Sequence, residues 1–238
     1  MLDNINNILN NSLIYNNFTE ILTALDETIL LLLVSLPIGF ILSLIFAIGR
    51  VSNNLLISKL IASYIFTIRG TPLLVQIYLI YFGLGSIELI RESFLWIALK
   101  EPFWCGVIAL TINTVAYGSE IFRGGIQAVS KGQIESGKSL GFSRIGIYRR
   151  IIFPIALRQV LPTYGNELIL MVKATSLISL TTYMEMTGIA RKIMAKTFAP
   201  VEAFIAAGIL YLFLNFLVVQ LIKYLEWKYN PHLRLNKI

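Results

Sequence analysis

The sequence contains a single cysteine and a single histidine in 238 residues. Cys105 alone cannot build a disulfide framework or a cysteine cluster for a metal. His232 alone leaves zinc or haem chemistry with almost no histidine ligands. We therefore expect no metal site and no catalytic residues of these kinds.

Charge is scarce as well, since 14% of the residues are charged and a soluble domain has about 25%. Hydrophobic residues make up 56%, and the mean hydropathy is +0.74. A soluble fold of this size has too little interior for so much apolar surface, whereas a bilayer accommodates it. The net charge is +7, and the charged residues lie in short gaps between apolar runs, as in membrane proteins. We therefore exclude nucleic acid as a partner.

The N-terminal region lacks the basic start of a secretory signal peptide, because the first Lys or Arg is Arg50. Residues 1–20 are predicted to be a tail outside the cytoplasm. Within it, hydrophobic residues at helical spacing fit an interfacial helix, and a polar tail is the alternative. The spaced residues are Ile5, Ile8, Leu9 and Leu13.

Five segments are apolar enough for transmembrane helices, which need about 20 such residues. We predict an all-α polytopic membrane protein with about five transmembrane helices in a single domain over 21–225, followed by a cytoplasmic tail at 226–238. The spans are expected at 21–48 (beginning nearer Thr28), 72–84, 103–122, 164–184 and 203–224.

The second apolar stretch, 55–84, is interrupted at Arg69-Gly-Thr-Pro72. Thr71 suits a helix N-cap, and Pro72 suits the first helical position. Residues 55–68 are then an interfacial helix, unless the break is a kink within one long helix. Arg69 is interpreted as positioning this loop on the cytoplasmic side.

Lys and Arg counts predict the orientation. The gap at 49–69, the loop at 123–158 and the C-terminal end from Lys223 carry 14, and the opposite side carries five. The positive-inside rule therefore places the C-terminus in the cytoplasm and the N-terminus outside. Arg191, Lys192 and Lys196 oppose the trend on the outer side, where they either face an acidic partner or have no special role.

The longest segment outside the spans is 123–163, a helix-rich loop in which Pro154 and Pro162 are predicted to stop helices. Residues 132–139 match the phosphate-binding pattern GxxxxGK[ST]. A true P-loop follows a buried strand and works with a magnesium-binding Asp on another strand. Neither is present here, and Glu135 would oppose the phosphates, so we exclude a nucleotide site.

The same residues fit another spacing. Glu135, Gly141 and Pro154 match the cytoplasmic "EAA" loop of bacterial ABC importer permeases, which reads Glu-Ala-Ala, three residues, Gly, nine residues, Ile-x-Leu-Pro. Ser136-Gly137 replaces Ala-Ala, and Gly137 is expected to loosen the helix. Gly141 permits a tight turn. The resemblance implies a coupling helix that docks on an ATPase through basic residues, namely Lys138, Arg144, Arg149 and Arg150. The alternative is that these residues form a basic face on anionic lipid.

Further segments resemble the polar amino-acid permeases, most of all the M subunit of histidine and lysine-arginine-ornithine importers. They lie at 48–53, 66–76, 111–117, 120–125 and 166–171, and the likeness covers about 25–225. It implies an ABC type I importer permease fold in the bacterial inner membrane, with no chemistry or cofactor of its own. It also implies lipid surroundings and as partners a second permease subunit, two ATPase subunits that use the ATP, and a periplasmic amino-acid-binding protein.

Glu167 is the leading substrate-binding candidate, because an acid inside a span is costly and indicates function. Its carboxylate is expected to pair with a cationic amino acid such as histidine, lysine, arginine or ornithine. A structural ion pair, for example with Lys173, is the alternative. Asn113, Tyr117 and Tyr164 are weaker candidates as polar lining.

Glu120 and Arg123 are interpreted as a structural pair or gate rather than as substrate ligands. The other functions considered are a permease for another polar amino acid such as glutamine, a membrane-embedded enzyme, and a scaffold protein. The sequence shows no paired acids, nucleophile–base set or metal cluster to favour an enzyme.

Overall fold

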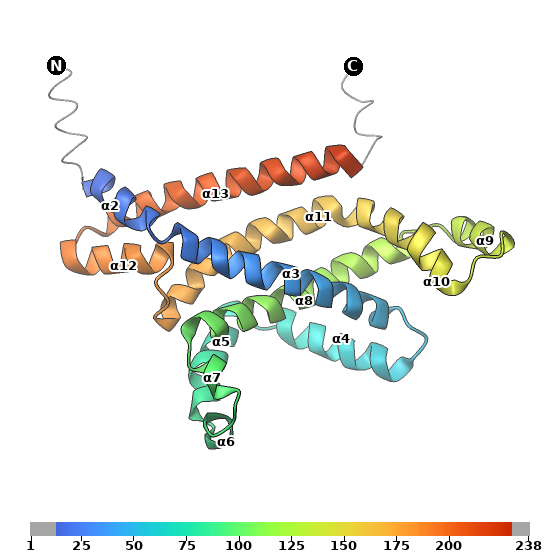
Figure 1. Ribbon diagram of the computed structural model, residues 1–238, viewed down its shortest axis with the longest axis horizontal. Helices are drawn as coiled ribbons and strands as arrows, with labels where there is room; N and C mark the ends of the chain where they lie inside the picture. The colour runs from blue at the N-terminus through green and yellow to red at the C-terminus, as the bar shows by residue number, and fades with distance from the viewer. Residues whose placement is uncertain (1–12, 230–238) are drawn as a thin grey trace, which may run out of the picture. The chain divides into compact units, whose positions relative to one another are not determined.

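The computed structural model describes residues 13–229. These residues form helices and no strand, which confirms the predicted all-α class (Figure 1). The interfacial helix predicted from Ile5, Ile8 and Leu9, and the tail beyond residue 229, lie outside the described residues. The helices in chain order are α2 (Leu13–Leu22), α3 (Leu25–Arg50), α4 (Leu55–Arg69), α5 (Leu73–Tyr78), the π-helix η1 (Leu79–Gly83), the 3₁₀-helix η2 (Leu84–Ser86), α6 (Glu88–Arg91), α7 (Trp96–Leu99), α8 (Pro102–Gln127), α9 (Lys131–Ser139), α10 (Arg144–Ile147), the π-helix η3 (Tyr148–Ile152), α11 (Phe153–Ala174), the 3₁₀-helix η4 (Thr175–Thr181), α12 (Met186–Thr197) and α13 (Pro200–Tyr229).

The number of crossings agrees with the predicted five when broken helices are counted as single spans. Asn17–Arg50, Pro102–Gln127 and Pro200–Tyr229 are each long and apolar enough to cross a membrane. Two bent pairs pass the same test together, namely Leu55–Arg69 with Leu73–Ser86, and Arg144–Thr181 with Met186–Thr197. The first pair is bent by 102° and the second by 49°, so each is either a broken span or a re-entrant segment.

Two predictions from proline were wrong. Pro162 lies inside α11 and does not stop it, and Pro154 is the second residue of α11, directly after η3. Proline removes one backbone donor from a helix, a loss that neighbouring helices in a membrane protein can compensate. The break at residue 70 was predicted, but Pro72 and not Thr71 is the N-cap of α5.

The described residues fall into two compact units, and α3, α8, α11 and α13 each contribute residues to both. The first unit contains the described residues up to Pro37, then Thr71–Thr111 and Leu170–Leu217. The second contains Ile38–Gly70, Ile112–Ile169 and the described residues from Val218 onward.

The first unit packs α3, α8 and η4 around buried aliphatic side chains. A Cβ atom on Gly106 of α8 would lie 2.8 Å from Ile178 Cγ2 and 3.3 Å from Leu31 Cδ2, so only glycine allows this approach. Both neighbours are fully buried. Helix α12 is attached to this core by a hydrogen bond from the Met186 amide to the Thr28 hydroxyl.

The second unit packs aromatic rings between α3, α8 and α11. Phe40, Phe122 and Tyr164 contact one another with centroid separations of 5.2 to 5.5 Å. A Cβ on Gly125 would lie 2.3 Å from Val160 Cγ1, so α8 and α11 cross closely here. This core supports the polar hollow described next.

Candidate functional site

A hollow of about 610 Å³ lies in the second unit, beside α4 and α8. Side chains of α4 supply its apolar wall, including Ile65 and Phe66. Its polar lining comes from the last residues of α3 and α4, Arg50 and Arg69, and from Tyr117 and Glu120 within α8.

Local capping and one long-range hydrogen bond position α4. The Asn54 side chain caps the helix by accepting from the amides of Leu56 and Ile57, a common N-cap arrangement. The Tyr64 hydroxyl donates to the Ile112 carbonyl at 2.7 Å. Helix α4 is thereby held against α8.

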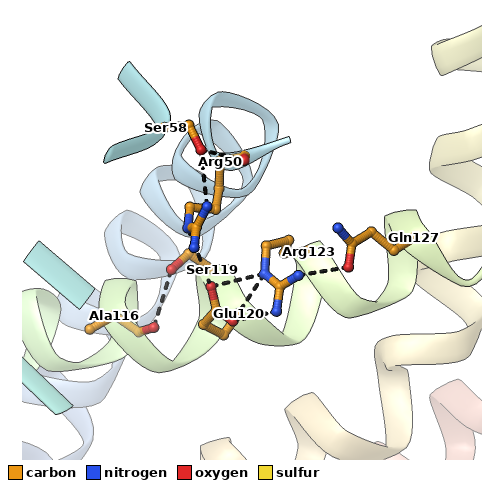
Figure 2. A network of polar contacts seen from close by, with 7 residues as sticks. All are labelled: Arg50, Ser58, Ala116, Ser119, Glu120, Arg123 and Gln127. Atoms are coloured by element: carbon orange, nitrogen blue, oxygen red, sulfur yellow. Dashed lines mark hydrogen bonds and ion pairs between the residues drawn. The ribbon is translucent and has the colours of Figure 1, made fainter. Parts of the chain in front are cut away.

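The carboxylate of Glu120 is the centre of an ion network (Figure 2). Arg123 donates to it through Nε at 3.0 Å and through Nη2 at 2.6 Å, and also donates to Gln127. The Arg50 Nε lies 3.9 Å from the same carboxylate, while its Nη1 donates to Ser58 at 2.9 Å. The predicted Glu120–Arg123 pair is confirmed, and Arg50 is an addition that sequence reasoning missed.

Arg69 was predicted to position the loop, but the structure also places it in the hollow. Its guanidinium carbon lies 5.0 Å from the centroid of the Tyr117 ring, a cation–π geometry. Its positive charge acts on Glu120 and on Glu167. The available sequence signal was an arginine at the end of an apolar helix, directly before a break.

The four predicted substrate residues are only partly brought together. Tyr117 lines the hollow, and Glu167 of α11 is 5% exposed and lies within reach of the Arg69 charge. Asn113 is buried on α8, one turn before Tyr117. Tyr164 instead belongs to the aromatic core, and among the described residues it is not part of the lining of this hollow.

Glu167 has an unusual environment for a carboxyl group. Within residues 13–229, its side chain forms no hydrogen bond and no salt bridge, and Lys173, the alternative partner, is exposed. A buried acid without a strong partner is energetically costly. This position is therefore suited to receive a cation from outside the chain.

The loop with the EAA spacing folds as a helical hairpin, α9 and α10, beyond the ends of α8 and α11 (Figure 1). Glu135, Ser136 and Gly137 lie in α9, so the stretch that matches the P-loop pattern is helical. Gly141 has a φ of +77° and makes the predicted tight turn. Ser143 then caps α10 by accepting from the Gly146 amide.

Gly137 has a packing role that its low helix propensity concealed. It is buried, and a Cβ there would lie 2.5 Å from Ile151 Cδ1 and 3.5 Å from Ile147 Cγ1. Helix α9 continues through it without a break. Glycine therefore brings α9 close to α10 and η3, where Val129, Ile147, Ile152 and Ala156 form a small core.

The outer surface of the hairpin combines charge with apolar side chains. Leu140 is 73% exposed and Ile145 is 80% exposed. The basic residues around them, Lys138, Arg144, Arg149 and Arg150, are also exposed. Such a mixed surface is typical of a protein-binding face more than of a purely solvated one.

A second polar hollow, of about 440 Å³, lies in the first unit beside α12. Arg191 and Lys192 line it together with Met184 and Met194. The Arg191 Nη1 donates to the Ser179 carbonyl at 3.2 Å. Two of the three cations that opposed the charge trend therefore share one surface.

Comparisons with known proteins agree on one family. The family model described as "Binding-protein-dependent transport system inner membrane component" matches residues 27–230. The nopaline transport system permease protein NocM of Agrobacterium fabrum is 48% identical over 93% of this chain and 92% of its own length. The histidine/lysine/arginine/ornithine transport system permease protein HisM of Escherichia coli K12 is 40% identical over 89% and 90%.

Solved structures show the same fold. A crystal structure of an amino acid ABC transporter with histidines superposes with a TM-score of 0.77 at 34% identity, over 88% of this chain and 94% of the other. The MetNI methionine ABC transporter superposes with a TM-score of 0.63 at 13% identity, over 92% and 96%. The second likeness concerns the fold alone.

Proposed function

The chain belongs to the family of binding-protein-dependent transport system inner membrane components, and from this premise we propose that it carries cationic amino acids. Its coarser role follows from the family and its relatives: it is a multi-pass inner-membrane permease of an amino-acid ABC transporter. The finer substrate class rests on the chemistry of the second unit.

The observation that carries the substrate proposal is the buried carboxyl group of Glu167, which no described side chain neutralises by a salt bridge. A cationic side chain of lysine, arginine, ornithine or histidine would supply the missing charge. Arg69 is then available for the α-carboxylate, and Tyr117 and Asn113 for polar contacts. The name of HisM, which lists histidine, lysine, arginine and ornithine, supports this class.

The coupling role is proposed for the α9–α10 hairpin. Two ATPase subunits would bind the exposed surface of the hairpin and transmit their closure through α9 to the spans, because α9 packs on η3, which continues into α11. Hydrolysis of ATP would occur only in those subunits, so this chain requires no cofactor of its own. A second permease subunit, homologous or identical, would complete the pathway.

The outer partner is proposed to be a periplasmic amino-acid-binding protein. With the N-terminus outside and the C-terminus in the cytoplasm, α12 faces the outer side. The hollow lined by Arg191 and Lys192 then supplies positive charge to an acidic surface on that protein.

The substrate proposal is tested by Glu167→Gln in the assembled transporter with one fixed binding protein. Loss of the negative charge should raise the apparent KM for arginine by about tenfold, the cost of one charge-assisted contact. Glu202→Gln, at the start of α13, is the matched control. Unchanged arginine uptake in the Glu167 variant, or equal uptake of glutamine, would reject the cationic class.

The non-catalytic role has a separate test. The purified chain alone should show no ATP hydrolysis above background. ATP hydrolysis that is robust in the isolated chain and disappears in Lys138→Ala would instead assign a nucleotide site to α9.

A further inference from the structure

The second unit holds another hollow, of about 460 Å³, formed by α3, α11 and α13. We name it the α11–α13 groove. Four leucines line it, Leu157, Leu161, Leu168 and Leu225, together with aromatic side chains and a proline. Among the described residues that line it, Arg158 is the one with a charge, and its side chain is exposed.

The groove follows from the packing of its two main helices. At Gly165 a Cβ would lie only 2.6 Å from Ile222 Cγ2, so α11 and α13 are in close contact there. Nearer the start of α11, Leu161 and Leu157 share the groove with Leu225 and Tyr229 of α13. The close contact ends at this point, and an apolar space remains between the helices.

On α11 the lining of the groove runs from Phe153 to Leu168, which is about 22 Å along the helix axis and about half of a bilayer that is about 40–45 Å thick with its headgroups. Leu168 follows Arg158 by ten residues, which is about 15 Å along a helix axis. Half of a hydrocarbon core of about 30 Å is also about 15 Å. An acyl chain that begins at Arg158 would therefore end near Leu168.

Polar groups lie where a phospholipid would need them. Arg158 follows Phe153, the first α11 residue of the lining, by five residues, and Lys228 Nζ lies 5.8 Å from the ring centroid of Tyr229, another lining residue. Tyr164 also lines the groove, and its hydroxyl is buried within the protein.

We propose that the α11–α13 groove binds one anionic phospholipid. Its phosphate contacts Arg158, and one acyl chain follows Leu157, Leu161 and Leu168. Cations at the membrane face of a groove between helices are a recognised basis for binding acidic headgroups. This site requires only that the chain spans a membrane, so it stands independently of the substrate class proposed above.

The test quantifies lipid that stays bound to the full-length chain, purified with its partner subunits, after exchange with phosphatidylglycerol or phosphatidylcholine. Native mass spectrometry should detect phosphatidylglycerol retained in preference to phosphatidylcholine. Arg158→Ala should weaken phosphatidylglycerol retention about fivefold, the contribution of one cation at an anionic surface. Leu161→Trp should exclude the chain sterically and remove retention of both lipids.

Lys59→Ala is the matched control, because Lys59 is an exposed cationic residue of the same unit that does not line the groove. It should leave retention unchanged. Equal retention of phosphatidylglycerol by the unchanged chain, Arg158→Ala and Leu161→Trp would overturn the proposal. Efficient disulfide linkage between two chains carrying Leu161→Cys and Cys105→Ala would also overturn it, by assigning the groove to a second subunit.

Discussion

At the scale of single residues, Gly141 gives the sharpest prediction. Its φ of +77° is in the left-handed region, and a Cβ there would meet no atom within 4 Å. Gly141→Ala should therefore destabilise the hairpin by about 1–2 kcal/mol through backbone strain alone. Hydrogen exchange should show this as faster exchange of the amides in α9 and α10. Gly141→Asn should cost less, because asparagine tolerates this conformation better.

Gly132 provides the internal control for this prediction. It lies in α9, again with open space around the position of a Cβ, so Gly132→Ala should slow exchange through better helix propensity. If both alanine variants changed amide exchange in the same direction, the left-handed conformation at residue 141 would not determine the stability of the hairpin.

The residues also show where prediction from sequence reaches its limit. Glu120 and Arg123 are three apart on one helix, so their pairing was predictable from spacing. Arg50 and Arg69 meet Glu120 and Tyr117 from other helices. Such contacts depend on how α3 and α4 pack on α8, which periodicity in one segment does not determine.

At the scale of elements, a substitution on the exposed surface of the α9–α10 hairpin is expected to weaken docking of the ATPase without impairing folding. Leu140 is 73% exposed, so Leu140→Asp should leave the amount of chain in the membrane unchanged. It should lower co-purification of the ATPase by about tenfold, since burial of one leucine contributes about 1.5–3 kcal/mol. Leu89→Asp on α6, where Leu89 is 82% exposed, should keep the ATPase bound.

Helix α12 gives a prediction about a buried polar network. The Tyr211 hydroxyl donates at 2.5 Å to Glu185, the fully buried N-cap of α12, and accepts from Thr187. Tyr211→Phe leaves that acid short of a donor, at a cost of about 1–3 kcal/mol, and should speed proteolysis within α12. Tyr224 is an exposed tyrosine of α13, the helix that also carries Tyr211, so Tyr224→Phe should leave proteolysis within α12 unchanged. Equal sensitivity of the two variants to protease would contradict the anchoring role of Tyr211.

The elements themselves were largely predictable. Apolar length located the spans, and Gly70 with Pro72 located the break that ends α4. The helix through Pro162 was not predictable, because local propensity at proline was outweighed by packing that lies far away in sequence. The role of Gly137 was hidden for the same reason, since Ile151 is its neighbour only after α9 folds back on η3.

At the scale of the whole molecule, the family was predictable because the EAA spacing is a long pattern with few alternative explanations, and the relatives confirm it. The division of the chain into two compact units, with four helices shared between them, had no signal in the sequence. It arises from contacts between segments that are far apart along the chain.

The most direct measurement is uptake of labelled arginine into proteoliposomes that contain this chain with its ATPase, second permease and binding protein. The account predicts uptake that requires ATP and is competed by lysine and histidine but not by glutamine. ATP-dependent uptake that glutamine abolishes and lysine leaves unchanged would contradict the proposed role as a permease for cationic amino acids.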